Sequence, residues 1–236
     1  MSNYVKTIMC LASSKKEGGR CVAGKSMSPG ERGQWIRPVS VRTTAEISLD
    51  ERRYEDGQEP QLLDIIDIPM MAPVPRSHQS ENHMIDSDEY WRKTGTAAWD
   101  DLHELVDNPS NLWGIESSTN VGLFDRVTPA TAAKLTNSLW LIRPRDVTIR
   151  VLTPGAAFGN SKRKVRARFE HNGTQYDFMV TDLVAEPWFL ARPNGDFRIE
   201  QNAYFCVSLG EAHTDSYGNT FCYKLVAAII TERPLK

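Results

Sequence analysis

One stretch of the sequence decides the fold, Arg163-Lys-Val-Arg-Ala-Arg-Phe-Glu-His-Asn-Gly-Thr-Gln-Tyr-Asp-Phe-Met-Val-Thr181. Its Asn172-Gly173 pair suits the two-residue type I′ turn of a β-hairpin, because both residues accept a positive φ. This turn fixes the register of the two antiparallel strands that it joins. The predicted cross-strand pairs are His171 with Thr174, Phe169 with Tyr176, Ala167 with Phe178 and Val165 with Val180.

The opposite face of the first hairpin strand is positively charged. Side chains alternate between the two faces of a strand, so the cations of this segment gather on one side. They are Lys162, Lys164, Arg166 and Arg168, with Asp177 across from Arg168. A basic strand face favours binding to nucleic acid, and it is also compatible with an ordinary solvated surface.

The rest of the chain also shows short strands separated by turn residues. The expected strands cover residues 4–12, 35–40, 62–68, 138–142, 147–153, 204–209 and 221–231. One helix is expected at residues 96–107, and a shorter one where Thr128 precedes Pro129. Prolines at 69, 73 and 75 predict an extended connector over residues 70–84. The expected fold class is therefore mainly β with one or two short helices.

Length and charge set outer limits on the architecture. The 236 residues suffice for two small domains, and Arg143-Pro144-Arg145 interrupts strand-like sequence at the expected boundary. The net charge is only −2, but residues 1–49 carry 8 Lys/Arg against 3 Asp/Glu, and residues 142–170 carry 8 against 2. Between them, residues 50–107 carry 5 against 15. If the two basic segments meet in space, they form one positive groove.

The cysteines and the hydropathy indicate a cytoplasmic location. The four cysteines, Cys10, Cys21, Cys206 and Cys222, are too few and too widely spaced for a disulfide scaffold, and no C-x-x-C pair suggests a metal site. A reducing compartment is therefore expected. No stretch approaches the roughly twenty apolar residues of a membrane span, so no membrane partner is expected.

Residues 19–26, Gly-Arg-Cys-Val-Ala-Gly-Lys-Ser, match the phosphate-loop pattern G-x-x-x-x-G-K-[ST]. In a true phosphate loop, a helix follows at once and directs its first backbone N–H groups at the phosphates. Here Pro29, Gly30 and Gly33 stand where that helix would run. We interpret the match as accidental, and we expect no nucleotide cofactor and no nucleotide hydrolysis.

A succession of short motifs extends over nearly the whole chain. They are Gly18–Lys25 (GGRCVAGK), Trp35–Ser40 (WIRPVS), Leu62–Pro69 (LLDIIDIP), His78–Asn82 (HQSEN), Val180–Asp182 (VTD), Val207–Glu211 (VSLGE) and Tyr223–Ile230 (YKLVAAII). In this order they resemble the bacterial dual OB-containing domain family. The resemblance implies two OB-like β-barrels, at residues 1–143 with the connector and helix and at residues 144–236. It also implies a place beside helicase, nuclease or DNA-modification components of phage-defence systems.

OB barrels bind oligonucleotides on one sheet face and its flanking loops. Single-stranded DNA or RNA needs cations for its phosphates and aromatic rings on which its bases stack. The candidates in the first basic segment are Lys15, Lys16, Arg20, Lys25, Trp35 and Arg37. Those in the second are Lys162, Lys164, Arg166 and Arg168, and Trp91 and Trp113 are further candidate platforms unless they are buried in the core.

A second set of candidates centres on His78-Gln79-Ser80-Glu81-Asn82, a dense run of hydrogen-bonding side chains. It is interpreted either as a structural latch that satisfies backbone groups or as a ligand pocket. Asp182 and Glu211, each at the end of an expected strand, are candidate acid–base partners of His78. The residue pattern defines no catalytic residue and no metal site.

The sequence thus favours a nucleic-acid-binding accessory protein without catalysis of its own. The main alternative is an enzyme or sensor that binds a nucleotide-like small molecule between the barrels, through Arg20, Arg37, His78 and Glu81. A protein–protein adaptor that positions a helicase or nuclease is the third possibility.

Overall fold

The computed structural model describes residues 3–16, 18–215 and 217–235. Contacts divide the chain into a first unit, Met1–Leu105, and a second unit, Val106–Lys236. The division falls before the expected boundary at residues 143/144. The segment after Leu105 belongs to the second unit because its strand β8 (Leu139–Ile142) pairs with β13 (Ala203–Thr214).

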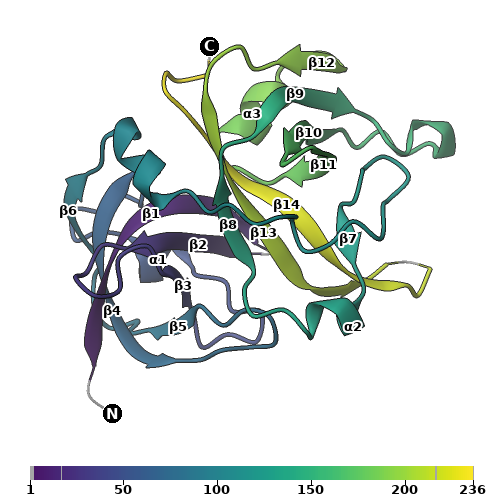
Figure 1. The fold of residues 1–236 in the computed structure, drawn as a ribbon. Helices are drawn as coiled ribbons and strands as arrows, with labels where there is room; N and C mark the ends of the chain where they lie inside the picture. The colour runs from purple at the N-terminus through teal and green to yellow at the C-terminus, as the bar shows by residue number, and fades with distance from the viewer. Residues whose placement is uncertain (1–2, 17, 216, 236) are drawn as a thin grey trace. The chain divides into compact units, whose positions relative to one another are not determined.

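The first unit is a closed five-stranded barrel with one added strand (Figure 1). Its strands are β1 (Tyr4–Lys16), β2 (Gly19–Ser26), β3 (Trp35–Val39), β4 (Asp64–Pro73), β5 (Asn82–Ile85) and β6 (Arg92–Thr96). They follow the order β1-β2-β3-β5-β4, and the pairing of β1 with β4 closes the ring. All pairs in the ring are antiparallel except β3–β5, which is parallel.

Alternation along β4 shows how the sequence builds this barrel. Ile66, Ile68 and Met70 are fully buried, while the residues between them are partly exposed. Their side chains join Ile8 and Trp91 in the core of the unit. A strand that buries every second residue has one face on the core and one face toward solvent, as a small barrel requires.

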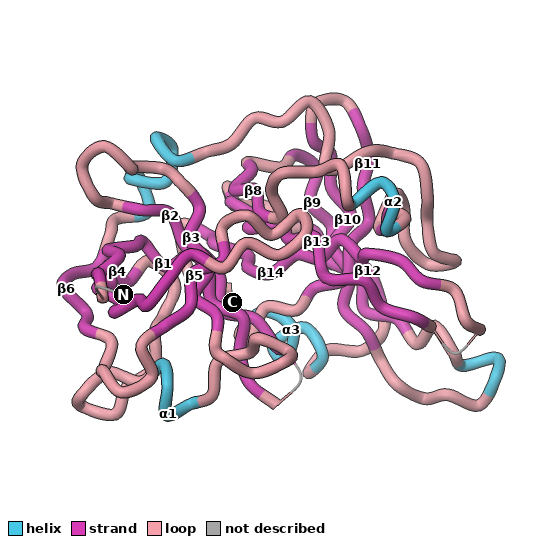
Figure 2. Tube along the Cα trace, turned by 90° about the horizontal axis from the view of Figure 1, so that it is seen from below, coloured by secondary structure: helices cyan, strands magenta, loops and turns pink. Residues whose placement is uncertain are grey.

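The second unit repeats this connectivity in a larger sheet. Its further strands are β7 (Arg126–Val127), β9 (Arg145–Leu152), β10 (Lys164–His171), β11 (Thr174–Val180), β12 (Gly195–Arg198) and β14 (Thr220–Thr231). The order β9-β10-β11-β14-β13 again places the third strand parallel to the fifth. Strand β12 extends this sheet beyond β9, and β8 extends it beyond β13. Strands make up most of the ordered elements in both units (Figure 2).

The predicted hairpin is confirmed as β10 and β11. His171 faces Thr174, Phe169 faces Tyr176 and Ala167 faces Phe178, with Asn172 and Gly173 at positive φ in the turn. Phe169, Tyr176 and Phe178 are fully buried and pack edge to face or stacked within the core of the second unit. The mainly β fold class that the hairpin indicated is therefore correct.

The helices are short. They are α1 (Leu49–Arg52), α2 (Pro129–Ala132) and α3 (Ala185–Leu190), with 3₁₀ turns η1 (Trp99–Leu105) and η2 (Ala156–Phe158). The shorter predicted helix is confirmed as α2, whose N-cap is Thr128 and whose first residue is Pro129. The helix predicted at residues 96–107 is instead the 3₁₀ turn η1. Leu102 and Leu105, three residues apart, still share its buried side because a 3₁₀ helix has three residues per turn.

Two other sequence patterns meet different outcomes. Residues Gly19–Ser26 form strand β2, and residues 28–33 are turns and bends, so no helix follows the phosphate-loop match, as the sequence predicted. The extended connector predicted at residues 70–84 is wrong at both ends, since β4 continues to Pro73 and β5 begins at Asn82. Strand pairing within the barrel outweighs the proline signal there. Among the described residues, no helix combines the length and the apolar character that a membrane crossing requires.

Candidate nucleic-acid interface

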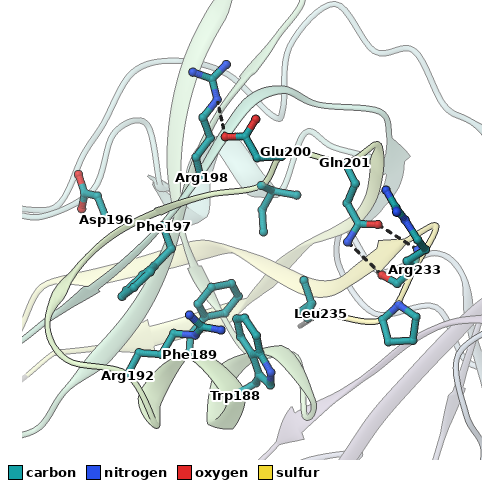
Figure 3. Close-up of a pocket in the computed structure, with 12 residues that line it drawn as sticks. Trp188, Phe189, Arg192, Asp196, Phe197, Arg198, Glu200, Gln201, Arg233 and Leu235 are labelled. Atoms are coloured by element: carbon teal, nitrogen blue, oxygen red, sulfur yellow. Dashed lines mark hydrogen bonds and ion pairs between the residues drawn. The ribbon is translucent and has the colours of Figure 1, made fainter.

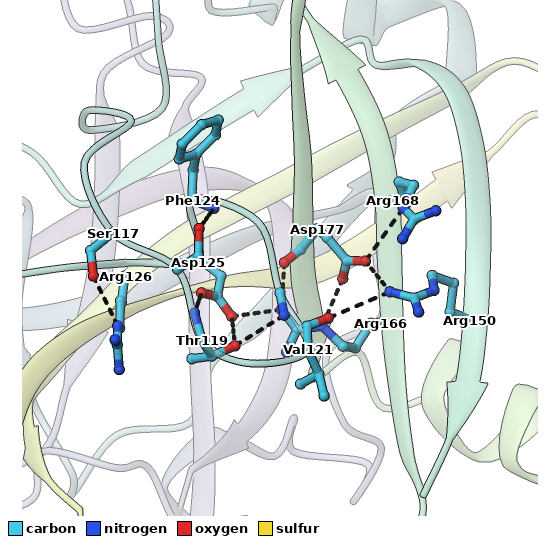
Figure 4. Close-up of polar contacts among 12 residues, drawn as sticks. Ser117, Thr119, Val121, Phe124, Asp125, Arg126, Arg150, Arg166, Arg168 and Asp177 are labelled. Carbon is cyan, nitrogen blue, oxygen red and sulfur yellow. Dashed lines mark hydrogen bonds and ion pairs between the residues drawn. The ribbon is translucent and has the colours of Figure 1, made fainter. Parts of the chain in front are cut away.

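Three arginines of the second unit gather around one aspartate on the polar face of the sheet (Figure 4). Arg150 stands on β9, Arg166 and Arg168 on β10, and Asp177 on β11. The register brings them together, because Arg166 pairs with Arg150 and Arg168 pairs with Asp177 across neighbouring strands. Along β10, the arginines alternate with Val165, Ala167 and Phe169, whose side chains point into the core.

The buried Asp177 carboxylate contacts all three guanidinium groups. Arg166 Nε lies 2.6 Å from Asp177 Oδ1, Arg150 Nη1 bonds Oδ2, and Arg168 Nε lies 3.6 Å from Oδ2. Arg166 also bonds the carboxylate of Asp125 at 2.7 Å. Three guanidinium groups therefore face two buried carboxylates, and the more exposed carboxylate of Asp196 lies 3.7 Å from Arg150 Nε.

The loop at residues 117–125 forms one side of this site. Leu123 exchanges both backbone hydrogen bonds with Asp177, at 3.1 and 3.3 Å. Thr119 donates to the Asp125 carboxylate from its backbone N–H and its hydroxyl, at 2.7 and 2.6 Å. Gly122 allows the close approach, because a Cβ there would lie 2.0 Å from Asp125 Oδ2 and 2.1 Å from Arg166 Nη2.

The end of the loop is held by a buried lysine. Lys224 on β14 donates from its backbone N–H to the carbonyl of Asp125 and from Nζ to the carbonyl of Gly114, at 2.8 and 2.6 Å. Burial lowers the pKa of the Lys224 ammonium to about 7, although the carboxylates of Asp125 and Glu116 act in the opposite direction. The loop is therefore held by an amine whose protonated and neutral forms are both populated near pH 7.

A hollow of about 490 Å³ opens between this loop and the strands. Its strand side is lined by Arg150, Arg168, Gln175 and Asp177, and its loop side by residues 120–123. The side chain of Arg168 is 49% exposed and that of Arg150 is 23% exposed, whereas Arg166 is buried. The Nε of Arg150 makes no hydrogen bond with any described residue and lies 3.7 Å from Asp196 Oδ1. Arg150 Nε is itself buried, so the half-exposed Arg168 offers the more accessible donors at this hollow.

Two connections of the second unit lie at the right of Figures 1 and 2. They are the loop that joins β9 to β10 (residues 153–163) and the turn that joins β13 to β14. Each carries an exposed aromatic side chain, Phe158 at 90% and Tyr217 at 88%. Lys162 is exposed in the first loop, and Lys164 is half-buried at the start of β10.

The candidates of the first basic segment all lie in the first unit, and their exposure differs. Lys15 is exposed, and Lys16, Arg20 and Trp35 are half-buried. Lys25 is buried, with Nζ bonded to the carbonyl of Leu105 at 2.6 Å and 5.3 Å from the centre of the Trp35 ring. Arg37 is also buried, so these two cations stabilise the barrel. Trp91 and Trp113 are core residues, which removes them as stacking platforms.

The His78–Asn82 segment is the turn between β4 and β5. His78, Gln79, Glu81 and Asn82 are all buried. Arg37 donates its backbone N–H to the carbonyl of Glu81 at 2.8 Å, and its guanidinium lies 3.3 Å from the Glu81 carboxylate. Asn82 Nδ2 donates to Gln79 Oε1 at 3.2 Å. These contacts join the segment to β3 and so favour the latch interpretation, although the buried Asn82 Oδ1 has no hydrogen-bond partner among the described residues.

Asp182 and Glu211 belong to the second unit, whereas His78 belongs to the first. Asp182 accepts hydrogen bonds from the backbone N–H groups of Val184, Ala185 and Ile229, at 2.7 to 2.8 Å. Burial raises the pKa of Asp182 despite these bonds. The carboxylate fixes the start of α3 to β14. Glu211 is half-buried within β13.

Sequence reasoning missed several residues of this face. Arg150 stood within an expected strand, at a position whose alternation with Ile149 and Val151 signals a polar face. Phe158 was a large apolar side chain in a Gly-rich loop, which is also a usable signal. Asp125 had no local signal, because its partner Arg166 lies 41 residues away.

Comparison with known protein families agrees with this architecture. The model of the dual OB-containing domain matches residues 6–229. The chain belongs to this family. The two units share one order of five strands, and a five-stranded Greek-key barrel is the architecture of the OB fold. The strand order therefore agrees with two OB folds in this chain. A search of curated proteins found no match.

Proposed function

We propose that this dual OB protein binds single-stranded nucleic acid on the β10–β11 face of its second unit. OB folds bind oligonucleotides on their second and third strands and on the loops that join strands 1 to 2 and 4 to 5. In the second unit these elements are β10, β11, residues 153–163 and the β13–β14 turn. The observation that carries the proposal is the arginine cluster at the centre of that face.

The donors of the cluster support phosphate binding. Asp125 and Asp177 bind Arg166, which is the most fully enclosed, and Asp196 lies beside Arg150, so the half-exposed Arg168 is the guanidinium most open to a phosphate. A guanidinium carries five N–H donors, so the ion pairs of Arg150 and Arg168 with Asp177 leave donors for phosphate oxygens. Lys162 adds a further exposed charge on the flanking loop.

The exposed aromatic rings favour a single strand over a duplex. Unpaired bases stack on aromatic side chains, and each such contact contributes about 1–3 kcal/mol to binding. Phe158 and Tyr217 are the two most exposed large hydrophobic side chains of the described residues. They stand on the β9–β10 loop and the β13–β14 turn, which correspond to the two loops that OB folds use beside their second and third strands, so bases can stack there while phosphates contact the arginines.

The test compares two double variants that remove equal charge. Arg168→Gln/Lys162→Gln changes the proposed face, and Arg92→Gln/Lys134→Gln removes two exposed cations elsewhere. Binding of a fluorescent single-stranded oligonucleotide is measured by anisotropy at several salt concentrations. We expect the first variant to lower the slope of log affinity against log salt by about 1.4, since each phosphate contact contributes about 0.7 for a single strand. Equal slopes for both variants and the unmodified protein would contradict the proposal.

The cellular setting is part of the same proposal. Family resemblance suggests an accessory role beside a helicase or nuclease of a bacterial defence system, and the four free thiols support a cytoplasmic location. Co-purification from the native host with an antibody against this protein tests the association. Recovery of the protein without a helicase or a nuclease would contradict it.

A further inference from the structure

A second hollow, of about 630 Å³, lies in the second unit beside α3 and β12 (Figure 3). Its floor is apolar. Trp188 and Phe189 come from α3, Phe197 from β12, Ile199 from the residues that follow β12, and Leu235 from the last described residues. All five pack against the core of the unit, and Phe189 is fully buried. The volume is within the range of small-molecule sites.

An arginine is stacked on this floor. Arg192 Cζ lies 3.7 Å from the centre of the Trp188 ring and 5.5 Å from the centre of the Phe197 ring. Trp188 is itself held edge to face on Phe189, with the ring centres 4.6 Å apart. A guanidinium over an indole forms a flat cationic surface, and such surfaces stack with planar aromatic ligands.

The backbone that carries Arg192 is fixed from a neighbouring loop. Arg163, in the β9–β10 loop, donates from Nη1 to the carbonyl of Leu190 at 2.7 Å and from Nη2 to the carbonyl of Arg192. Its Nε donates to Asn194 Oδ1 at 2.9 Å. The segment between α3 and β12 is therefore held in place before any ligand arrives, and preorganisation of this kind favours binding.

The rim of the hollow carries charges of both signs, since Arg233 and Arg198 lie there with Asp196 and Glu200. Gln201 bonds the backbone N–H and carbonyl of Arg233, each at 3.0 Å, which fixes the segment that bears both Arg233 and Leu235. The Arg198 side chain points away from the apolar floor, on the opposite side of the strand from Phe197 (Figure 3). Arg233 is therefore the rim cation that is left for an anionic ligand.

We infer that this hollow is a nucleotide-binding site. The base stacks on the Trp188–Arg192 pair above the apolar floor, and the phosphate pairs with Arg233 at the rim. A planar base with an attached phosphate satisfies the flat cationic surface and the rim arginine together. None of these contacting residues belongs to the arginine cluster around Asp177, and Asp196, which lines the hollow and lies 3.7 Å from Arg150 Nε, contacts the ligand in neither proposal.

The test uses calorimetric titration with four mononucleotides (AMP, GMP, CMP and UMP) and with the matching nucleosides. Arg233→Gln removes the phosphate partner, and its side chain is exposed, so the fold is preserved. We expect this variant to bind nucleotides at least about tenfold more weakly than the unmodified protein, because hydrogen bonds to a charged group are lost. Its affinity for nucleosides should equal that of the unmodified protein. Trp188→Leu should weaken both ligand classes by about 5- to 150-fold.

Matched controls separate this inference from the strand-binding proposal. Lys134→Gln removes an exposed cation of the same unit and should leave mononucleotide affinity unchanged. Arg168→Gln/Lys162→Gln should weaken oligonucleotide binding and spare mononucleotide binding. Absence of mononucleotide binding at millimolar concentration would overturn the inference. So would equal nucleotide affinity in the Arg233→Gln variant and the unmodified protein.

Discussion

Arg166 donates from Nε to Asp177 Oδ1 across 2.6 Å, and both side chains are buried on a sheet face that the sequence assigned to solvent. The pair lies beneath the loop of Asp125, whose carboxylate binds the same guanidinium. Charge alternation along β10 correctly indicated which face Arg166 occupies. Burial by a loop from elsewhere in the chain makes Arg166 a structural residue, so the proposed phosphate contacts fall to its neighbours.

The first prediction concerns that pair. Arg166→Gln should lower the free energy of unfolding by about 3–5 kcal/mol, because it leaves two buried carboxylates without their shared cation. Arg168→Gln, on the same strand face but half exposed, should change it by no more than about 1 kcal/mol. Urea unfolding of both variants at neutral pH makes the comparison. Equal stability of the two would show that the buried pair contributes nothing to the fold.

Gly122 provides an independent probe of the same loop. Gly122→Ala would place a methyl group 2.0 Å from Asp125 Oδ2 and 2.1 Å from Arg166 Nη2, so the ion pair must shift. We expect a loss of about 1–3 kcal/mol in the free energy of unfolding. Gly18→Ala is the control, since a Cβ at Gly18 has no heavy atom within 4 Å. A melting temperature for Gly122→Ala as high as that of Gly18→Ala would contradict the packing.

Lys224 should make stability depend on pH. Its folded pKa of about 7 lies below the usual lysine value near 10.4, so between these values the unfolded chain binds more protons than the native one. The free energy of unfolding therefore rises with pH across this window, by at most about 1.4 kcal/mol per pH unit for one proton. Below pH 7 the native state contains a charged, buried ammonium and is at its least stable with respect to this group.

The measurement is urea unfolding of the unmodified protein and of Lys224→Met at pH 6.5, 7.5 and 8.5. The difference in unfolding free energy between the two proteins should grow in favour of the unmodified one as the pH increases. Groups that titrate elsewhere cancel in this difference. A difference that is constant with pH would mean that Lys224 keeps an ordinary pKa.

The turn between β4 and β5 tests the latch interpretation. Glu81→Ala leaves the buried Arg37 guanidinium without its carboxylate and should lower the free energy of unfolding by about 3–5 kcal/mol. Glu89→Ala, at an exposed position of the same unit, should change it by less than about 0.5 kcal/mol. Oligonucleotide affinity, measured where both variants are folded, should be unchanged. A Glu81→Ala protein that is stable but does not bind would support the pocket interpretation instead.

Local sequence patterns predicted the strands, turns and helices better than they predicted which side chains are exposed. The Asn172-Gly173 turn determined the hairpin register, and Thr128-Pro129 determined the start of α2, because both signals act within a few residues. The spacing of Leu102 and Leu105 indicated a buried helical side correctly, yet it could not distinguish an α-helix from a 3₁₀ turn. Three residues per turn and 3.6 residues per turn place both leucines on nearly the same face.

The sequence by itself determined the mainly β fold, the register of its central hairpin and the family to which the chain belongs, since turn chemistry and alternation are local properties. Only the tertiary structure decided which cations are exposed. Lys25 bonds a carbonyl 80 residues away, and Arg166 bonds a carboxylate 41 residues away. Such partners are chosen by sheet topology, which brings distant segments to one face. Arg150, Arg168, Phe158 and Tyr217 therefore became candidates only once the strands and loops of the second unit were placed.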